Sequence, residues 1–201
     1  MHQVVVIHGG DSFNTYEEYL SYLKNKIIQS PDYFKGRRDW KTTLQDTLGE
    51  AYEVFFPMMP NKRNARYIEW KIWFEKLVPF LTDNVVLIGH SLGASFLVRY
   101  LAEKRFPKRI GAVFLVSAAY EDFEDQNRSK EFAAPKTLEL FQNQVDKIFL
   151  YQSKDDPVIP FSELAKYQAA LPNATARVFT DRGHFNQDTF PELIADIKSF
   201  E

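Results

Sequence analysis

Four short runs of apolar residues constrain the fold of this chain more than any other feature. The runs are Val4–Ile7, Val85–Ile88, Ala112–Val116 and Ile148–Tyr151. Because they lack the polar alternation of a half-exposed strand, each predicts a strand covered on both faces. We expect two further strands, at Tyr52–Phe56 and Arg177–Thr180.

Segments with apolar residues at a helical period lie between these runs. The expected helices are Tyr16–Ile28, Ile68–Leu81, Leu92–Lys104, Ser162–Ala170 and Glu192–Phe200. Alternating strands and helices predict an α/β fold, with a mostly parallel sheet of about six strands and helices on both faces. We expect a single domain over residues 1–201. Ser30–Asp39 is expected to be an exposed loop before a short helix, and Tyr120–Lys136 a loop insertion or small lid.

Composition excludes several classes of function. The net charge of -2 and the lack of a Lys/Arg run argue against a nucleic-acid or membrane partner. The absence of cysteine excludes disulfides, thiolate catalysis and cysteine-ligated zinc. The first apolar run, Val4–Ile7, is too short for a signal peptide, so we expect a cytoplasmic location. The oligomeric state stays open.

The pentapeptide G-H-S-L-G at residues 89–93 follows one expected strand directly and leads into an expected helix. In such a strand-to-helix turn the serine has a strained backbone, and glycines two positions away on each side permit close approach. The Ser91 hydroxyl would stand above the carboxyl edge of the sheet, facing the amino end of the helix, where an anion is stabilised. The pattern predicts a nucleophilic serine. The alternative is a tight turn in which Ser91 caps the helix.

A serine hydroxyl needs a base, and the base needs an acid to orient it. In sites with this turn the order along the chain is serine, acid, histidine. Of the four histidines, His184 alone follows Ser91, and it lies in a polar loop after an expected strand. Asp155 and Asp156 both follow the strand at Ile148–Tyr151, and position does not choose between them. The alternatives are an exposed loop histidine and two turn aspartates before a proline.

These motifs resemble those of the α/β-hydrolase superfamily. The acid loop in many members reads D-x-V-V-P or nearly so, which residues 156–160 match, so the resemblance favours Asp156 over Asp155. The G-H-F run at residues 183–185 resembles the loop that carries the catalytic histidine. The short chain, with little sequence left for a cap, resembles the small retinoblastoma-binding-protein-type serine hydrolases.

The resemblance also implies an oxyanion hole. His8-Gly9-Gly10, at the end of the first expected strand, resembles the H-G motif that supplies part of it. The backbone N–H of Gly10 or of Gly9 would then join that of Leu92. The alternative is a simple strand-ending turn.

We therefore expect a serine hydrolase that cleaves small ester-like substrates (carboxylesters, thioesters or amides) through an acyl-enzyme on Ser91. The partner would be a small-molecule acyl substrate, and no metal or organic cofactor is implied. Because Tyr120–Lys136 is charged and carries few apolar residues, we expect an open, shallow site that prefers short acyl chains. The alternative is a non-catalytic ligand- or partner-binding protein on the same scaffold.

Overall fold

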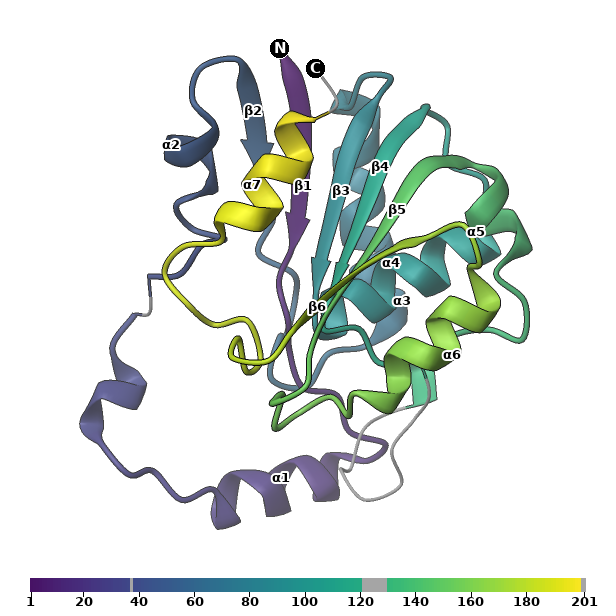
Figure 1. The fold of residues 1–201 in the computed structure, drawn as a ribbon. Coiled ribbons are helices and arrows are strands. Elements are labelled where there is room, and N and C mark those ends of the chain that lie inside the picture. Colours follow the sequence, from purple (N-terminus) through teal and green to yellow (C-terminus); the bar gives the residue numbers. More distant parts are fainter. Residues whose placement is uncertain (37, 121–129, 200–201) are drawn as a thin grey trace.

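A parallel sheet forms the centre of the molecule (Figure 1). The computed structural model describes residues 1–36, 38–120 and 130–199. Six strands lie in the order β2-β1-β3-β4-β5-β6, and all neighbouring pairs are parallel. The strands are β1 (His2–Ile7), β2 (Tyr52–Phe55), β3 (Val85–His90), β4 (Ile110–Val116), β5 (Val145–Ser153) and β6 (Thr175–Phe179). The expected α/β class with a six-stranded parallel sheet is confirmed.

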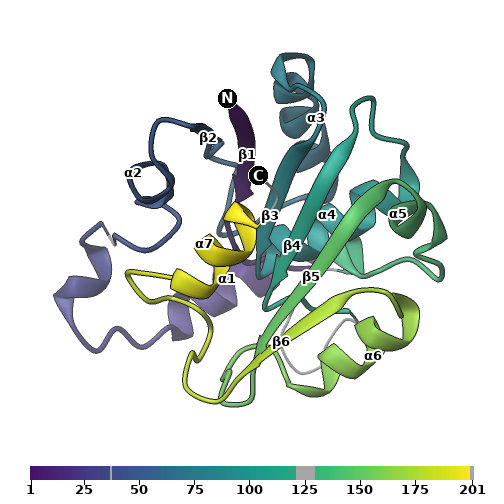
Figure 2. The ribbon, with the colours of Figure 1, turned by 45° about the horizontal axis from the view of Figure 1, so that its top comes forward.

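Helices cover both faces of this sheet (Figures 1 and 2). One face carries α3 (Tyr67–Leu77), α4 (Leu92–Glu103), α5 (Glu139–Asn143) and α6 (Ser162–Ala170), and the other carries α2 (Leu44–Leu48) and α7 (Pro191–Lys198). Successive side chains of a strand point to opposite faces. Val85 and Leu87 therefore pack with α3 and α4, whereas Val86 and Ile88 pack with α2 and α7.

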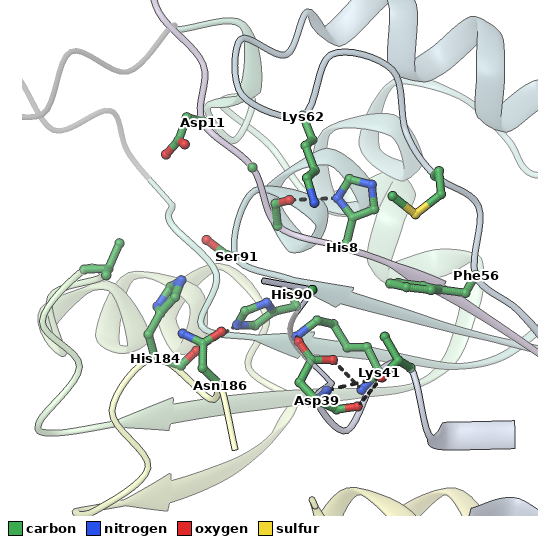
Figure 3. A pocket seen from close by; sticks show the side chains of 16 residues that line it. His8, Asp11, Asp39, Lys41, Phe56, Lys62, His90, Ser91, His184 and Asn186 are labelled. Carbon is green, nitrogen blue, oxygen red and sulfur yellow. Dashed lines mark hydrogen bonds and ion pairs between the residues drawn. The ribbon is translucent and has the colours of Figure 1, made fainter. Parts of the chain in front are cut away.

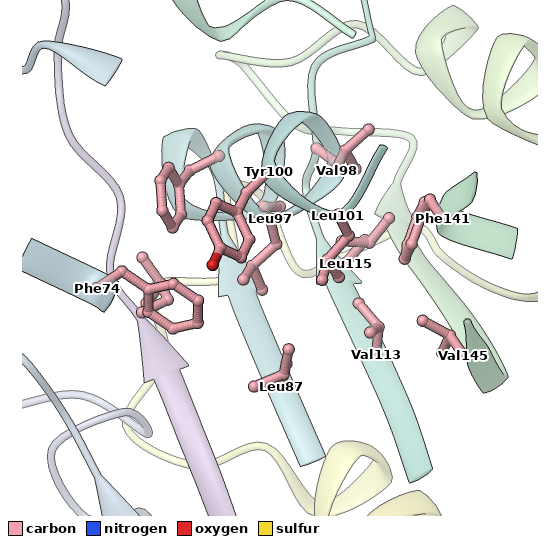
Figure 4. Close-up of a cluster of buried hydrophobic side chains, with 14 of the residues drawn as sticks. Phe74, Leu87, Leu97, Val98, Tyr100, Leu101, Val113, Leu115, Phe141 and Val145 are labelled. Atoms are coloured by element: carbon pink, nitrogen blue, oxygen red, sulfur yellow. The ribbon is translucent and has the colours of Figure 1, made fainter. Parts of the chain in front are cut away.

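The helix α4 is the centre of the larger hydrophobic cluster (Figure 4). Its residues from Leu92 to Val98 are all buried, as are Tyr100 and Leu101. The Phe74 ring of α3 meets the Tyr100 ring edge-on, with the ring centroids 5.1 Å apart. A helix packed on this scale cannot shift without disturbing the core, so the turn that leads into it is held firmly in place.

The bounds of two predicted elements differ from the expected ones for reasons that the local sequence shows. The helix expected at Ile68–Leu81 leaves the α-helical form after Leu77 and continues as a short 3-10 turn, Val78–Phe80. Pro79 explains this change, because proline has no N–H to donate inside a helix. The strand β5 extends beyond the apolar run Ile148–Tyr151 at both ends. The exposed Lys147 still pairs with β4, and the polar Gln152 and Ser153 pair with β6.

The helix α1 (Tyr16–Asn25) forms near its expected position but does not pack as an amphipathic helix usually does. A capping box between Thr15 and Glu18 secures its first turn. None of its residues is buried, although the side chains at a helical period are apolar. In Figure 1 it lies apart from the sheet, and a 3-10 turn at Pro31–Phe34 follows it on the way to α2. The segment expected as a loop at Ser30–Asp39 therefore contains this turn.

The possible lid at Tyr120–Lys136 lies partly outside the described residues, which omit 121–129. Within the described part, Lys130–Phe132 is a 3-10 turn, and Phe132 is buried against the rings of Tyr67 and Trp70 on α3. Among the described residues, no helix has the length and apolar character needed to cross a membrane. The cytoplasmic location stays a prediction.

Candidate active site

The candidate site lies where the order of the strands reverses. The chain passes from β1 to β2 on one side and then returns to β3 on the other side of β1. At such a switch the loops at the carboxyl ends of the two strands diverge and leave a crevice. Here those loops carry residues 8–11 after β1 and Ser91 after β3.

Ser91 occupies a strained turn between β3 and α4. Its φ of 54° is in the left-handed region, which a serine rarely adopts. A Cβ on Gly89 would lie 2.5 Å from the Ala94 Cα, and one on Gly93 would lie 2.3 Å from the Ile7 carbonyl oxygen. Both positions therefore require glycine, which is the steric reason for the G-x-S-x-G pattern.

Ser91 does not cap the helix that follows it. Its side chain makes no capping hydrogen bond to α4, while its backbone N–H donates to the Val116 carbonyl at 2.8 Å. The amino end of α4, starting at Leu92, is thus directed at the crevice without a side-chain cap. This geometry suits a developing negative charge near Ser91.

The loop after β6 brings His184 against the carboxylate of Asp156. The His184 Nδ1 lies 3.0 Å from Asp156 Oδ2 and 3.1 Å from Oδ1. The carboxylate is fully buried, and its Oδ1 also accepts the N–H groups of Val158 (2.8 Å) and Ile159 (3.0 Å). Its position is therefore set by the backbone of its own loop.

Ser117 supports the same carboxylate, although the sequence analysis gave it no role. It follows β4 with a φ of 53°, is fully buried, and its hydroxyl donates to Asp156 Oδ2. The Ser117 Oγ also lies 3.3 Å from His184 Nδ1. Its place directly after an apolar strand, at the edge where the other site residues lie, was the available signal.

These contacts affect the ionisation of Asp156. Burial alone raises the pKa of the Asp156 carboxyl, but the hydrogen bond and charge of His184 and the hydrogen bond from Ser117 lower it. The net pKa lies below the ordinary value for aspartate. Asp156 is therefore ionised near neutral pH and can accept the Nδ1 proton of His184.

Asp155 does something different from Asp156. Its Oδ1 accepts the Ser153 hydroxyl and the N–H of Gly183 at 3.0 Å. Ser153 in turn accepts the N–H of Arg182 at 3.1 Å. Asp155 thus ties the loop that carries His184 to the end of β5, and it lies on the exposed side of the turn.

The loop after β1 approaches Ser91 closely. A Cβ on Gly9 would lie 3.0 Å from the Ser91 Cβ, and one on Gly10 would lie 2.4 Å from the Lys62 carbonyl oxygen. His8 fixes this loop, because its Nε2 accepts the Met59 N–H at 2.9 Å and its Nδ1 donates to the Gly9 carbonyl at 2.7 Å. Burial lowers the pKa of His8, which keeps the ring neutral. The structure therefore brings Gly9 and Gly10 to the same pocket as Ser91, and the oxyanion hole stays a prediction.

A pocket of about 550 Å³ opens over Ser91 and His184 (Figure 3). Phe56, Met58 and Val158 supply apolar wall, whereas Asp11, Asp39, Lys41 and Lys62 supply charge. Lys41 pairs with Asp39 at 2.7 Å, and both are largely buried. Thr42, which precedes α2, also lines the pocket. No cluster of three or more metal-ligating side chains occurs within the described part of the chain.

Comparisons with known proteins agree with this geometry. The family model described as serine hydrolase matches residues 33–192. The serine hydrolase RBBP9 of Rattus norvegicus is 35% identical over 151 residues, covering 74% of this chain and 78% of that protein. The putative hydrolase YdeN of Bacillus subtilis (strain 168) is 24% identical over 191 residues, covering 92% and 87%. The crystal structure of the B. subtilis ydeN gene product superposes with a TM-score of 0.74 at 21% identity, covering 100% of this chain and 98% of that one. The fold is thus that of the α/β-hydrolases, and the chain belongs to the serine hydrolase family.

Proposed function

We propose that this protein hydrolyses small ester-like substrates by acyl transfer to Ser91 and then to water. The observation that carries the proposal is the pairing of His184 with the buried Asp156, because His184 lines the same pocket as Ser91 on its strained turn. Asp156 occupies Nδ1 of the ring, which leaves Nε2 as the nitrogen that accepts a proton from serine. Membership in the serine hydrolase family supports the same chemistry.

The reaction follows from these positions. His184 Nε2 takes the Ser91 proton as Oγ attacks the acyl carbon, and Asp156 stabilises the imidazolium that forms. The carbonyl oxygen becomes an oxyanion, held by the N–H of Leu92 and that of Gly9 or Gly10. Collapse of this intermediate expels the leaving group with the proton from His184. Water, deprotonated by His184, then attacks the acyl-enzyme, and Ser91 recovers its proton when the acid leaves.

The pocket favours small, partly polar acyl groups, of which carboxylesters are the simplest class to propose. Asp39 and Lys41 form part of its wall, and Phe56 and Met58 provide a limited apolar surface. A methylene that meets apolar wall gains about 0.8 kcal/mol, and one placed against a charged pair gains nothing. We therefore propose a preference for acyl chains of about two to six carbons, in keeping with a site of this size.

The proposal is tested by hydrolysis of p-nitrophenyl acetate by wild type, Ser91→Ala and the matched control Ser21→Ala. Ser21 lies exposed on α1, so its replacement should leave kcat/KM unchanged. Ser91→Ala should lose activity by several orders of magnitude with the fold intact, because members of a triad act as a unit. A wild-type protein that binds esters without Ser91-dependent turnover would favour the non-catalytic alternative.

A further inference from the structure

The loop that carries His184 is anchored by two rings from other parts of the chain. We propose that His90 and Trp40 form a clamp that positions this loop, so that both are positioning residues for the base. The inference rests on the proposed function, since it concerns the same base.

His90 holds the backbone of His184 directly. Its ring is buried, and its Nε2 lies 2.8 Å from the His184 carbonyl oxygen (Figure 3). A carbonyl oxygen only accepts, so Nε2 of His90 carries the proton and donates it. Burial lowers the pKa of His90 well below its ordinary value, so the ring stays neutral. A neutral ring with its proton engaged in this way donates to the loop and does not compete with His184 as a base.

Trp40 holds the next residues of the same loop. Its Nε1–H donates to the Phe185 carbonyl at 2.9 Å, and its backbone N–H donates to the Gln187 carbonyl at 3.2 Å. The indole also meets the His90 ring edge-on, with the ring centroids 6.2 Å apart. The two rings therefore act together: one anchors the carbonyl of the base residue and the other the carbonyl that follows.

The backbone of the loop closes a turn around His184, in which the Phe185 N–H donates to the Arg182 carbonyl at 3.0 Å. Ser153 and Asp155 hold the amino side of that turn, and the two rings hold its carboxyl side. The residues between Phe179, the end of β6, and Pro191, the start of α7, form neither helix nor strand. Gly183 and Phe185, on either side of the base, have φ values of 51° and 50°. Phenylalanine rarely adopts such a conformation, and it persists only where the surroundings fix it. Fixing the carbonyl of His184 fixes its peptide plane and, with it, the direction of its side chain.

The position of His90 in the chain gives the clamp a specific consequence. His90 directly precedes Ser91, so the turn that presents the nucleophile also grips the backbone of the base. The relative placement of Ser91 and His184 is thus set by a short path of covalent bonds and one hydrogen bond. Loss of that hydrogen bond should disturb the catalytic step more than substrate binding.

The test compares His90→Gln with His90→Phe. The Gln amide can place an N–H near the position of Nε2, whereas Phe keeps a ring of similar shape without a donor. We expect His90→Phe to lower kcat for p-nitrophenyl acetate by about 10- to 100-fold at nearly constant KM, the scale of a small misplacement of a reacting group. We expect His90→Gln to keep at least roughly a third of wild-type kcat by restoring the bond. His2→Phe, an exposed histidine on β1, is the matched control and should leave kcat unchanged.

A second readout does not depend on turnover. The proton shared between His184 Nδ1 and Asp156 should give a downfield proton NMR resonance, which His90→Phe should shift or broaden and His90→Gln should preserve. If this resonance responds as expected while wild type shows no Ser91-dependent hydrolysis, the clamp stands and the proposed function fails. Should His90→Phe not fold, Trp40→Phe removes the donor to the Phe185 carbonyl and should act in the same direction.

Equal losses of kcat in His90→Gln and His90→Phe would overturn the clamp, as would an unperturbed kcat and resonance in His90→Phe. A lower melting temperature with unchanged kcat would also overturn it, because that result describes a residue that only stabilises the fold.

Discussion

Replacing Asp156 by asparagine should switch His184 to the wrong tautomer. Oδ1 of Asp156 accepts the N–H groups of Val158 and Ile159, so the amide oxygen of asparagine must take that position. The amide nitrogen then takes the place of Oδ2, which lies 3.0 Å from Nδ1 of His184 in the wild-type protein. Oδ1 also lies 3.1 Å from Nδ1, but it already accepts two backbone N–H groups. Because two donors cannot share the Oδ2 contact, we expect Nδ1 to become the acceptor and the proton to move to Nε2. A ring protonated at Nε2 cannot take the proton of Ser91.

The size of the effect follows from that switch. In the Ser-His-Asp triad, a wrong tautomer lowers kcat by about 10⁴ while the geometry stays intact. At 1.36 kcal/mol per tenfold change, this loss corresponds to about 5.4 kcal/mol of transition-state stabilisation. Burial of Asp156 and the two backbone donors argue against a rearrangement that would rescue the base.

Asp155→Asn is the matched control, because it changes the neighbouring carboxylate in the same way. An amide oxygen at position 155 can still accept the N–H of Gly183, so kcat/KM should stay within about threefold of wild type. Both variants are assayed with p-nitrophenyl acetate, beside thermal melts that show intact folding. A larger loss in Asp155→Asn, or an Asp156→Asn variant that keeps more than about a tenth of wild-type activity, would refute the assignment.

Three further predictions concern stability, pH and substrate length. Gly93→Ala should lower the free energy of unfolding, measured in urea, by about 1–3 kcal/mol, because its Cβ would lie 2.3 Å from the Ile7 carbonyl oxygen. An unchanged urea midpoint of unfolding would contradict this steric reason. Burial lowers the pKa of His8 and His90, so the unfolded chain binds their protons first as the pH falls below 6.5. The free energy of unfolding should then fall by up to about 1.4 kcal/mol per pH unit for each histidine. A free energy of unfolding that stays constant between about pH 7 and 5 would contradict this prediction. For p-nitrophenyl esters, kcat/KM should level off or fall beyond about six carbons, whereas a steady rise to dodecanoyl would show a larger apolar pocket.

The centre of the sheet was predictable because its four inner strands are marked locally in the sequence. Runs such as Val85–Ile88 and Ala112–Val116 are apolar at every position, which fits strands covered on both faces, and alternation with helices then specifies parallel pairing. The packing of α1 was not predictable in this way. Its apolar period indicates a helix, but whether that face meets the sheet depends on the path of the chain after Asn25.

The candidate site was predictable only where a residue belongs to a local motif. Ser91 and His184 have such motifs, and the loop that starts at Asp156 resembles the family pattern. Ser117 and Trp40 were missed because their roles arise from contacts between distant parts of the chain. Ser117 reaches Asp156 across 39 positions, and Trp40 reaches Phe185 across 145. No spacing rule connects residues that only the folded sheet brings together.

The central claim is that Ser91 forms the acyl-enzyme, and covalent labelling tests it most directly. The native protein would be treated with a fluorophosphonate probe, and the modified peptide located by tandem mass spectrometry. We expect a single adduct on Ser91, formed slowly in His184→Ala and absent in Ser91→Ala, because the serine needs its base to react. An adduct on another residue, or labelling that survives in Ser91→Ala, would contradict the account.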